Sequence, residues 1–578
     1  MVLRGCISSV FNCDKPCSIM ISKLYSFITA LLAVLFFVPL ASAESRPNIV
    51  LVMVDDMGWS SIGCYGGMVE TPTIDRLAKN GVRFNQFYNG ARCCPTRATL
   101  MTGLHPHQVG IGHMTLPVKS AVDPKPGEAT SGFALLEADR SDVPASYQGW
   151  LNIDIPTLPE MLKASGYATY MTGKWHLASE QSETWPLQRG FDRFYGHLAG
   201  TSHFFAPANL HRGNQPIQAE GERYYITDAI SDQAIEYLEI HDKTKDAEPF
   251  FLYLAYNAPH FPLQCMPEDY EKYKGRYMEG WDALRVQRLA KQKRMGIVPE
   301  STQLAPRPEN IPAWDSLRAE KQVEMDGIMA TYAAMIDRVD QNLGKLVSHL
   351  EASGELDNTL ILFLSDNGGE AESGAFGRFN YADLGKYGSG GNKYGKGWAS
   401  LSNTPFREYK HYAHQGGVQS PLIAHWPKGI SSKLNNRILE QPSYLPDLVE
   451  TCLDIGAASR PERKNGKSVP KGEGVSLVKT LKGNSSNVHE KPFFIEHEGN
   501  RIARDGNWKL VSYYDKRWEL YDLDGDRSES NDLAKRHPEI VKRLNQAYVN
   551  WARRSGVVDW EIAKDFNVYD AIKRKAEK

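Results

Sequence analysis

Short apolar runs, each followed at once by polar residues, are the clearest pattern along this chain. Four of them stand at Asn48–Val54, Tyr167–Met171, Phe250–Tyr256 and Thr359–Leu364. Within each run the hydrophobic character is continuous and does not alternate with polar residues, which is typical of strands covered by helices on both faces. We therefore predict four buried strands of a mainly parallel sheet.

Helical periodicity lies between these runs. The segment 157–165 is bounded by Gly166, and the segment 329–350 carries apolar residues at helical spacing and ends near Gly354. Strands that alternate with helices indicate an α/β fold. Ligands of such sheets bind outside the carboxyl ends of the strands, so the polar residues that follow the four runs should gather there.

Two segments depart from this pattern and are interpreted as loops over the site. Residues 115–150 are rich in Pro, Ser and acidic side chains, and residues 384–400 are too rich in glycine for a regular element. Both should form the rim of a pocket, where an aromatic side chain such as Trp398 could stack on a substrate ring.

The pattern of hydrophobic and polar residues changes after Ser485. Short strand-like runs, separated by Asp, Gly and Asn, precede an amphipathic helical segment at 538–553. The chain is also too long for one hydrophobic core, so more than one structural unit is expected. We predict a catalytic domain over 44–485 and a small C-terminal α+β domain, an antiparallel sheet plus a helix, over 486–578.

Residues 1–43 have the order of a secretory signal. Lys23 precedes an apolar run at 27–38, and the small residues Ala41, Ser42 and Ala43 follow. The run is shorter than the roughly 20 residues that a membrane span needs. We predict export to the periplasm or the extracellular space, without stable membrane insertion after cleavage. An uncleaved anchor is the alternative, and Met20 is an alternative start.

Composition excludes some classes of protein. The chain has 42% hydrophobic and 24% charged residues and a formal net charge of -2, which is typical of a globular protein and argues against a nucleic-acid binder. Cleavage after Ala43 would leave an odd and sparse set of cysteines, so no disulfide framework is expected. That set is Cys64, Cys93, Cys94, Cys265 and Cys452.

Oxygen ligands follow two of the predicted strands. Asp55 and Asp56 come directly after the first run, and Asp366 and Asn367 follow the fourth run after one residue, Ser365. Neighbouring carboxylates repel one another unless a cation lies between them, and hard cations such as Ca²⁺ or Mg²⁺ prefer carboxylate and amide oxygens. We predict that these four residues hold one divalent cation.

A candidate anion site lies at Cys93–Gly103. Pro95 suits the first turn of a helix, and Arg97 lies one turn beyond Cys93. The start of a helix offers unpaired N–H groups and a partial positive charge to an anion. Further basic and acid–base candidates follow the second and third runs or precede Gly416: Lys174, His176, His260 and Lys410.

The segment from Cys93 to Gly103 resembles the signature of the type I sulfatases, with the bacterial arylsulfatases among them. The signature places Pro at the second position after its cysteine, Arg at the fourth and Thr-Gly at the ninth and tenth, and only Cys93 has this register. Thr96 stands where Ser is commoner, and Gln415 where Glu is usual. The resemblance extends over about 46–533.

This resemblance implies a fold like that of alkaline phosphatase and a specific cofactor chemistry. A formylglycine-generating enzyme would convert Cys93 into formylglycine, and this residue would join Asp55, Asp56, Asp366 and Asn367 as a ligand of the cation. The family uses calcium, and magnesium stays open from the sequence. The implied substrates are small-molecule or saccharide esters of sulfate, both aryl and carbohydrate.

The resemblance also implies a mechanism. A hydroxyl of the hydrated formylglycine displaces the alcohol from sulfur and forms a covalent sulfate hemiester. Arg97, Lys174, Lys410 and the cation neutralise the sulfuryl oxygens. His260, together with Lys410, protonates the leaving oxygen. His176 then accepts the proton of the second hydroxyl, so that the aldehyde re-forms and sulfate leaves.

Two other functions remain open at this point. The first is a phosphonate or phosphate ester hydrolase of the same superfamily, since some of these enzymes share formylglycine and a similar cation site. The second is a catalytically silent, secreted protein of the same fold that binds sulfated glycans. Such a binder has no need for Cys93 in the signature register, so the complete set of residues favours the sulfatase.

Overall fold

The structure of the protein is a computed structural model. It describes residues 46–116, 142–178, 181–244, 248–377, 385–388, 391–484 and 486–566. The predicted signal at 1–43 lies outside the described residues, as do 117–141 of the first predicted loop. Residues 384, 389 and 390 of the second predicted loop lie outside them as well.

The four predicted strands are present and lie side by side at the centre of a large sheet. They are β1 (Asn48–Val54), β3 (Ala168–Lys174), β7 (Phe250–Ala255) and β8 (Thr359–Ser365). Their order in the sheet is β8-β1-β7-β3, and all three pairings are parallel. All their residues are buried. Because the strands are parallel, their carboxyl ends meet at one edge of the sheet.

Antiparallel strands extend this parallel centre. β9 (Gln419–His425) runs antiparallel to both β8 and β2 (Val82–Tyr88), while β4 (Arg193–His197) continues parallel to β3. Within the described residues the sheet has eleven strands, so the predicted α/β class with a mainly parallel centre is confirmed. Its remaining strands are β5 (Leu210–Arg212), β6 (Gln215–Pro216), β10 (Arg437–Leu439) and β11 (Ser443–Tyr444).

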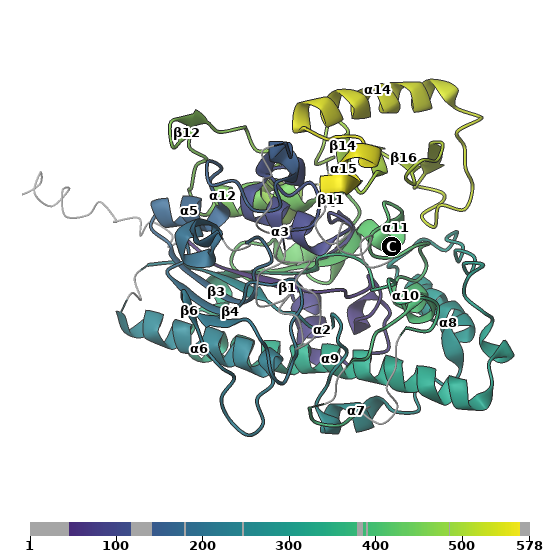
Figure 1. Ribbon diagram of the computed structural model, residues 1–578, viewed down its shortest axis with the longest axis horizontal. Helices are drawn as coiled ribbons and strands as arrows, with labels where there is room; N and C mark the ends of the chain where they lie inside the picture. The colour runs from purple at the N-terminus through teal and green to yellow at the C-terminus, as the bar shows by residue number, and fades with distance from the viewer. Residues whose placement is uncertain are drawn as a thin grey trace, which may run out of the picture. The chain divides into compact units, whose positions relative to one another are not determined.

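Helices cover both faces of this sheet, as the continuous apolar runs require. Val50 and Val52 of β1 belong to one core, which includes α2 (Pro72–Lys79), α6 (Ile226–Thr244) and α9 (Ala319–Ala352). Figure 1 shows α6 and α9 together below the sheet. The helix α9 begins at Ala319, before the predicted Met329, because its first turns are polar and lack the apolar spacing.

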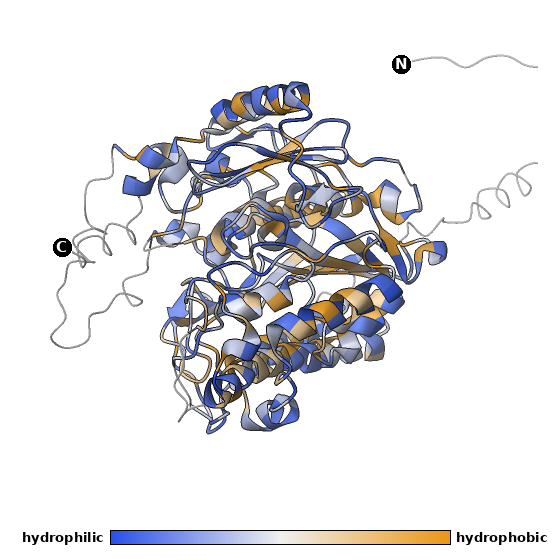
Figure 2. Ribbon diagram, turned by 90° about the vertical axis from the view of Figure 1, so that its right-hand side faces the viewer, coloured by the Kyte–Doolittle hydropathy of each residue, from blue (hydrophilic) through white to orange (hydrophobic). Residues whose placement is uncertain are grey.

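The opposite face belongs to a second core. Ile49 and Leu51 of β1 pack with α3 (Cys93–Thr102), α5 (Leu158–Ala164) and α12 (Leu445–Ile455). Figure 1 shows these helices above the strands, and Figure 2 shows the central strands in orange, with covering helices that carry both orange and blue. Alternate residues of one strand thus stabilise two separate layers.

The predicted small sheet is present near the C-terminus. Its antiparallel strands are β14 (Phe493–His497), β15 (Asn500–Asp505), β16 (Trp508–Ser512) and β17 (Glu519–Asp522). One face packs on α14 (Pro538–Ser555), and the other face packs against residues that include Tyr88 and Val418 of the large sheet region. The described residues form one compact unit, so the domain boundary at 485 stays a prediction.

The glycine-rich segment 384–400 contains a helix, so the prediction of an irregular loop is wrong there. The helix α10 (Lys396–Ser402) lies so close to Trp281 that a Cβ on Gly397 would be 2.8 Å from its ring. Trp398 is buried against Trp281 and Trp314, and its indole N–H donates to the carbonyl of Met325 at 2.8 Å. Trp398 is a core residue and not part of a pocket rim.

Every cysteine among the described residues is a free thiol, and all of them are buried. No described helix combines the length and the apolar character that crossing a bilayer requires. The remaining α-helices and strands of the described residues are α7 (Pro267–Tyr273), α8 (Gly280–Arg294), α11 (Gln415–Val418), α13 (Val478–Leu481), α15 (Trp560–Ala563), β12 (Arg463–Lys464) and β13 (Lys467–Ser468).

Candidate active site

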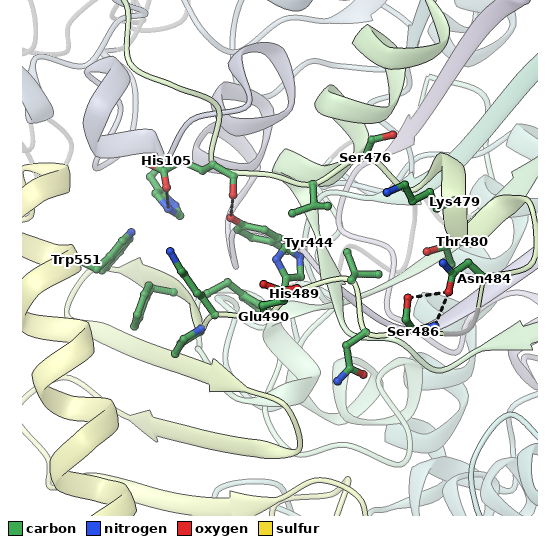
Figure 3. Close-up of a pocket in the computed structure, with 18 of the residues that line it drawn as sticks. His105, Tyr444, Ser476, Lys479, Thr480, Asn484, Ser486, His489, Glu490 and Trp551 are labelled. Carbon is green, nitrogen blue, oxygen red and sulfur yellow. Dashed lines mark hydrogen bonds and ion pairs between the residues drawn. The ribbon is translucent and has the colours of Figure 1, made fainter.

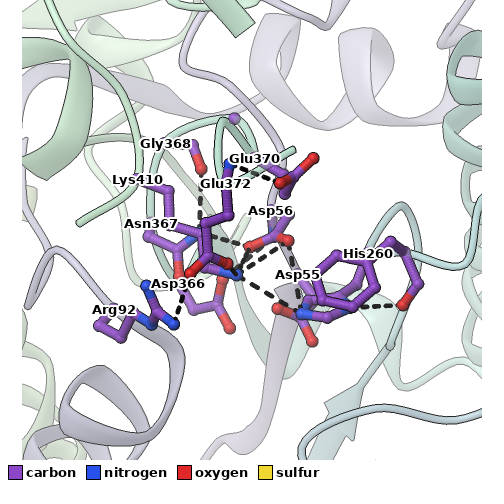
Figure 4. Close-up of polar contacts among 12 residues, drawn as sticks. Asp55, Asp56, Arg92, His260, Asp366, Asn367, Gly368, Glu370, Glu372 and Lys410 are labelled. Atoms are coloured by element: carbon purple, nitrogen blue, oxygen red, sulfur yellow. Dashed lines mark hydrogen bonds and ion pairs between the residues drawn. The ribbon is translucent and has the colours of Figure 1, made fainter. Parts of the chain in front are cut away.

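The four predicted oxygen ligands lie together beyond the carboxyl ends of β1 and β8. The backbone N–H of Asp56 donates to Asp366 Oδ1 at 3.2 Å, and Asn367 Nδ2 donates to Asp56 Oδ1 at 2.7 Å. Asp56 adopts a left-handed φ of 64°, and the hydroxyl of Tyr332 donates to its carbonyl at 3.3 Å. We call Asp55, Asp56, Asp366 and Asn367 the oxygen cluster (Figure 4).

The oxygen cluster has the properties of a cation site. Asp55 Oδ1 and Asn367 Oδ1 are buried and accept no hydrogen bond, although an unpartnered buried oxygen is costly. Burial and the charge of Asp55 raise the pKa of Asp366 well above its usual range. A divalent cation would give the free oxygens a partner and remove this repulsion, and carboxylate and amide oxygens are its preferred ligands. The residues therefore fit such an ion.

The helix α3 directs its N-terminus at this cluster. Cys93 is its first residue, and Arg97 follows one turn later. Arg97 Nη2 lies 2.8 Å from Asp366 Oδ2 and 3.6 Å from Asp55 Oδ2, while its Nη1 donates to the carbonyl of Lys174 at 3.0 Å. Thr96 Oγ1 donates to the carbonyl of Asp366 at 2.7 Å, so a threonine supplies the hydroxyl at this position.

Cys93 lies against His176 and Cys94. One ligand atom of each of these three buried residues lies within 4.8 Å of the others. The hydrogen bond with Cys94 lowers the pKa of the Cys93 thiol well below its usual range against the opposing effect of burial, and Lys174 and His176 lower it further. Burial lowers the pKa of His176 to about 4, so its imidazole is neutral near pH 7 and can accept a proton.

Two lysines and a second histidine contact the carboxylates. Lys174 Nζ pairs with Asp55 Oδ2, and Lys410 Nζ lies 2.8 Å from Asp56 Oδ1. Burial acts to lower the pKa of Lys410, but the Asp56 and Glu372 carboxylates raise it above its usual range, so the ammonium stays charged.

His260 lies next to Lys410. Its Nε2 is 3.4 Å from Lys410 Nζ and 3.5 Å from Asp56 Oδ2. Its Nδ1 lies 2.6 Å from the carbonyl oxygen of Phe261, which can only accept, so Nδ1 carries the proton and Nε2 faces the cluster.

The structure therefore brings every predicted site residue into one network of contacts. The network joins Asp55, Asp56, Cys93, Arg97, Lys174, His176, His260, Asp366, Asn367 and Lys410. A cation, a helix N-terminus and three basic side chains around one point can hold a tetrahedral anion and neutralise charge that develops on it.

Three further residues of the site were not predicted. Glu372 Oε1 lies 2.7 Å from Arg92 Nη2, and Glu372 Oε2 lies 3.6 Å from Lys410 Nζ (Figure 4). Both amide atoms of Asn257, which stands two residues after the end of β7, are buried without a hydrogen bond. Arg92 adjoins Cys93, and Asn257 follows a predicted strand. Both residues could therefore have been predicted from their positions beside these two features.

A separate cavity of about 720 Å³ does not belong to this network. His105, Tyr444, Glu473, His489 and Trp551 are among its lining residues (Figure 3), and none of the predicted site residues lines it. His105 follows the last turn of α3, whereas Cys93 begins this helix. The cavity therefore lies toward the opposite end of α3, away from the polar network.

Comparisons with known proteins agree with this geometry. A family model described as Sulfatase matches residues 47–456, and a model described as N-sulphoglucosamine sulphohydrolase, C-terminal, matches residues 408–553. An uncharacterized sulfatase of Schizosaccharomyces pombe is 32% identical over 561 residues, which cover 89% of this chain and 95% of the relative. An arylsulfatase of Klebsiella aerogenes is 32% identical over 408 residues, 67% of this chain and 82% of the relative.

The fold also matches solved structures. The crystal structure of Ps i-CgsB in complex with k-i-k-neocarrahexaose has a TM-score of 0.60 and 24% sequence identity, and the match covers 88% of this chain and 93% of that chain. At this level of identity the match shows that the two chains share the fold.

Proposed function

The chain belongs to the sulfatase family and is a sulfuric ester hydrolase, and from this premise we propose that it cleaves its ester with a formylglycine made from Cys93. The observation that carries the proposal is the place of Cys93, at the buried start of α3 and in contact with His176. Only Cys93 has the register of the family signature, and Cys94 does not. Its maturation would require a formylglycine-generating enzyme as a partner.

We further propose that the oxygen cluster holds one divalent cation. The unpartnered oxygens of Asp55 and Asn367 support this proposal, and the family resemblance favours Ca²⁺ over Mg²⁺. When bound, the cation would withdraw electron density from the oxygens of the sulfate group and so favour attack at sulfur.

Side chains of the protein would bind the sulfate group and transfer the protons. Arg97, Lys174 and Lys410 would bind the sulfuryl oxygens and neutralise their charge. One hydroxyl of the hydrated aldehyde at residue 93 would bond to sulfur as the bond between sulfur and the alcohol oxygen breaks, and it would pass its proton to a carboxylate of the oxygen cluster. His260, protonated at Nε2 as well as at Nδ1, would together with Lys410 donate a proton to the alcohol oxygen.

His176 would act in the second half of the reaction. Its neutral imidazole would accept the proton of the remaining hydroxyl at residue 93. The carbonyl of residue 93 would re-form as its bond to the sulfate oxygen breaks, and sulfate would leave. A serine at this position lacks the second hydroxyl and could not release sulfate in this way.

The first experiment measures maturation and turnover together. The chain is produced with and without a formylglycine-generating enzyme, the peptide that contains residue 93 is analysed by mass spectrometry, and hydrolysis of 4-nitrophenyl sulfate is assayed. We expect activity in proportion to the aldehyde content. Full turnover from a chain with an intact Cys93 thiol would contradict the proposal, and faster cleavage of an aryl phosphonate would favour the phosphonate hydrolase.

The substrate class needs a second experiment. We propose aryl or carbohydrate sulfates, because one relative is an arylsulfatase and one structural neighbour was solved with an oligosaccharide. A panel of sulfated saccharides and aryl sulfates would separate these classes by kcat/KM. A matured chain that binds these sulfates without releasing sulfate would indicate the glycan binder.

Export to the periplasm or the extracellular space also remains a proposal, which rests on the signal-like residues 1–43. Sequencing the N-terminus of the mature protein from each cell fraction would test it. An N-terminus at Met1 or Met20 in protein held by the membrane would indicate the uncleaved anchor.

A further inference from the structure

A second group of metal-ligating side chains lies outside the catalytic network. It consists of His411, His497 and Glu498, which we call the imidazole cluster. His411 Nδ1 lies 3.0 Å from Glu498 Oε2, and His497 Nε2 lies 3.3 Å from Glu498 Oε1. One ligand atom from each of the three residues lies within 4.8 Å of the other two. The cluster is therefore compact enough to surround one ion.

His497 provides the strongest sign that a ligand is missing. Its side chain is 1% exposed, and neither of its ring nitrogens makes a hydrogen bond. Apart from the 3.3 Å contact of Nε2 with the Glu498 carboxylate, the buried ring nitrogens have no polar partner, which is costly, and a metal ion between Nε2 and that carboxylate would offset the cost. His411 is 29% exposed, so an ion from solvent can reach the cluster from its side.

The backbone presents Glu498 to these histidines in an unusual conformation. Glu498 and Gly499 form the two-residue turn between β14 and β15, and they have φ values of 51° and 79°. Such turns favour Asn or Asp before Gly, so a Glu with positive φ is held there at an energetic cost. Its carboxylate is also contacted by His113 Nε2 at 3.2 Å, which fixes its orientation.

We propose that the imidazole cluster is a second metal site, which binds a transition-metal dication of the Zn²⁺ type through His411 Nδ1, His497 Nε2 and the carboxylate of Glu498. Two imidazoles and one carboxylate form a known three-residue ligand set for Zn²⁺, with a fourth position open. Ca²⁺ and Mg²⁺ prefer oxygen ligands, so they would select the oxygen cluster instead. His113 acts as a positioning residue for the carboxylate.

The location of the cluster gives the metal a structural role. His411 directly follows Lys410, and its backbone N–H donates to the carbonyl of Ala91 at 2.9 Å, two residues before Cys93. His497 and Glu498 belong to the end of β14 and its turn. A bound ion would therefore tie the small sheet to the segments that carry Lys410 and Cys93.

The test must separate this site from other places that could take Zn²⁺. Cys93, Cys94 and His176 form one such place, and the oxygen cluster is another. We would use the full chain with Cys93→Ala and Asp366→Asn as the background, in excess Ca²⁺, and titrate Zn²⁺ by calorimetry. The visible absorption of Co²⁺ in the same background reports the coordination geometry. Because this background is inactive, the outcome is independent of the proposed sulfatase mechanism.

We expect one Zn²⁺ per chain and tetrahedral Co²⁺ bands. His411→Gln and His497→Phe should each weaken Zn²⁺ binding by about tenfold or more, since each removes one of three ligands. His537→Gln, on an exposed histidine that contacts Trp508, is the matched control and should leave the affinity unchanged.

Two results would overturn the proposal. One is the absence of Zn²⁺ binding in the background chain, and the other is unchanged affinity in His411→Gln. The substitution at buried His497 carries a risk of misfolding, whereas His411 is partly exposed, so His411→Gln decides the matter even when His497→Phe cannot be purified.

Discussion

The oxygen cluster and the imidazole cluster differ in how the chain assembles them. Asp55 and Asp366 meet because β1 and β8 are parallel neighbours whose carboxyl ends lie at one edge. His411 and Glu498 meet only because the small sheet packs against the loop after Lys410. The first cluster is a product of strand order, and the second is a product of contact between two sheets.

The chemistry of the two clusters differs in the same way. The oxygen cluster offers carboxylates and an amide, whereas the imidazole cluster offers two imidazoles and one carboxylate. Hard cations prefer the oxygen ligands of the first cluster, and Zn²⁺ accepts the imidazoles of the second. The two clusters should therefore select different kinds of ion. Changes at each cluster should therefore affect different properties of the protein.

The largest effect is expected for Cys93→Ser. Because serine cannot release sulfate by re-forming a carbonyl, kcat for 4-nitrophenyl sulfate should fall by about 10⁴-fold or more, while Zn²⁺ binding at the imidazole cluster stays unchanged. Steady-state kinetics and mass spectrometry for a sulfated serine would check this. Cys265→Ser, at a buried thiol outside the catalytic network, is the control and should remain active. Multiple turnovers by Cys93→Ser would contradict the expectation.

A second, smaller effect is expected for Asp366→Asn. The change removes one carboxylate of the oxygen cluster and the partner of Arg97 at 2.8 Å, so kcat should fall by about 10²- to 10³-fold. Thermal unfolding should then lose its stabilisation by Ca²⁺ but keep that by Zn²⁺. Asp505→Asn, which breaks an ion pair with the exposed Arg543, controls for charge. Loss of both stabilisations together would mean that the two clusters are not independent.

Lys509→Met tests the attachment of the small sheet. Lys509 Nζ lies 2.5 Å from Glu529 Oε1 and donates to Gln415 Oε1 at 3.0 Å, and both charged side chains are fully buried. Removal of the ammonium leaves a buried carboxylate unpaired, which should lower the free energy of unfolding by about 3–5 kcal/mol in urea titrations. Lys509→Met with Glu529→Gln should recover most of the loss. Equal losses in both variants would show that the ion pair itself is not responsible.

The smallest effect is expected for Trp398→Phe, outside both clusters. The change removes the hydrogen bond to Met325 and part of the indole, so the free energy of unfolding should fall by about 1–2 kcal/mol, while KM for aryl and saccharide sulfates stays the same. Urea unfolding and kinetics on the same preparation would measure both. A raised KM with unchanged stability would instead indicate that Trp398 belongs to the rim of the substrate pocket.

The sequence predicted the centre of the fold and the catalytic network because both depend on local signals. Continuous apolar runs identify buried strands, and the polar residues at their ends, such as Asp55 and Asp366, must then share an edge. The strand β15 was missed because Asn500–Asp505 has polar or charged residues at both of its ends and lacks a continuous apolar run.

Other features could not be predicted, since they depend on packing between distant segments. The glycines around Trp398 suggested a loop, although Gly397 serves to bring α10 close to Trp281. The histidines of the imidazole cluster lie in two separate segments, and nothing local in the sequence indicates that His411 and His497 meet. Only the docking of the small sheet brings them together.

The three tryptophans around α10 have a practical consequence. The ring centroids of Trp281, Trp314 and Trp398 lie 4.9–5.5 Å apart, so their indoles form a rigid chromophore inside one core. Fixed aromatic packing of this kind gives a near-ultraviolet circular dichroism signal, which vanishes when side-chain packing loosens while helices persist. The protein thus carries its own optical reporter, in a hydrophobic core that contains no residue of either cluster, for distinguishing local damage from global loosening.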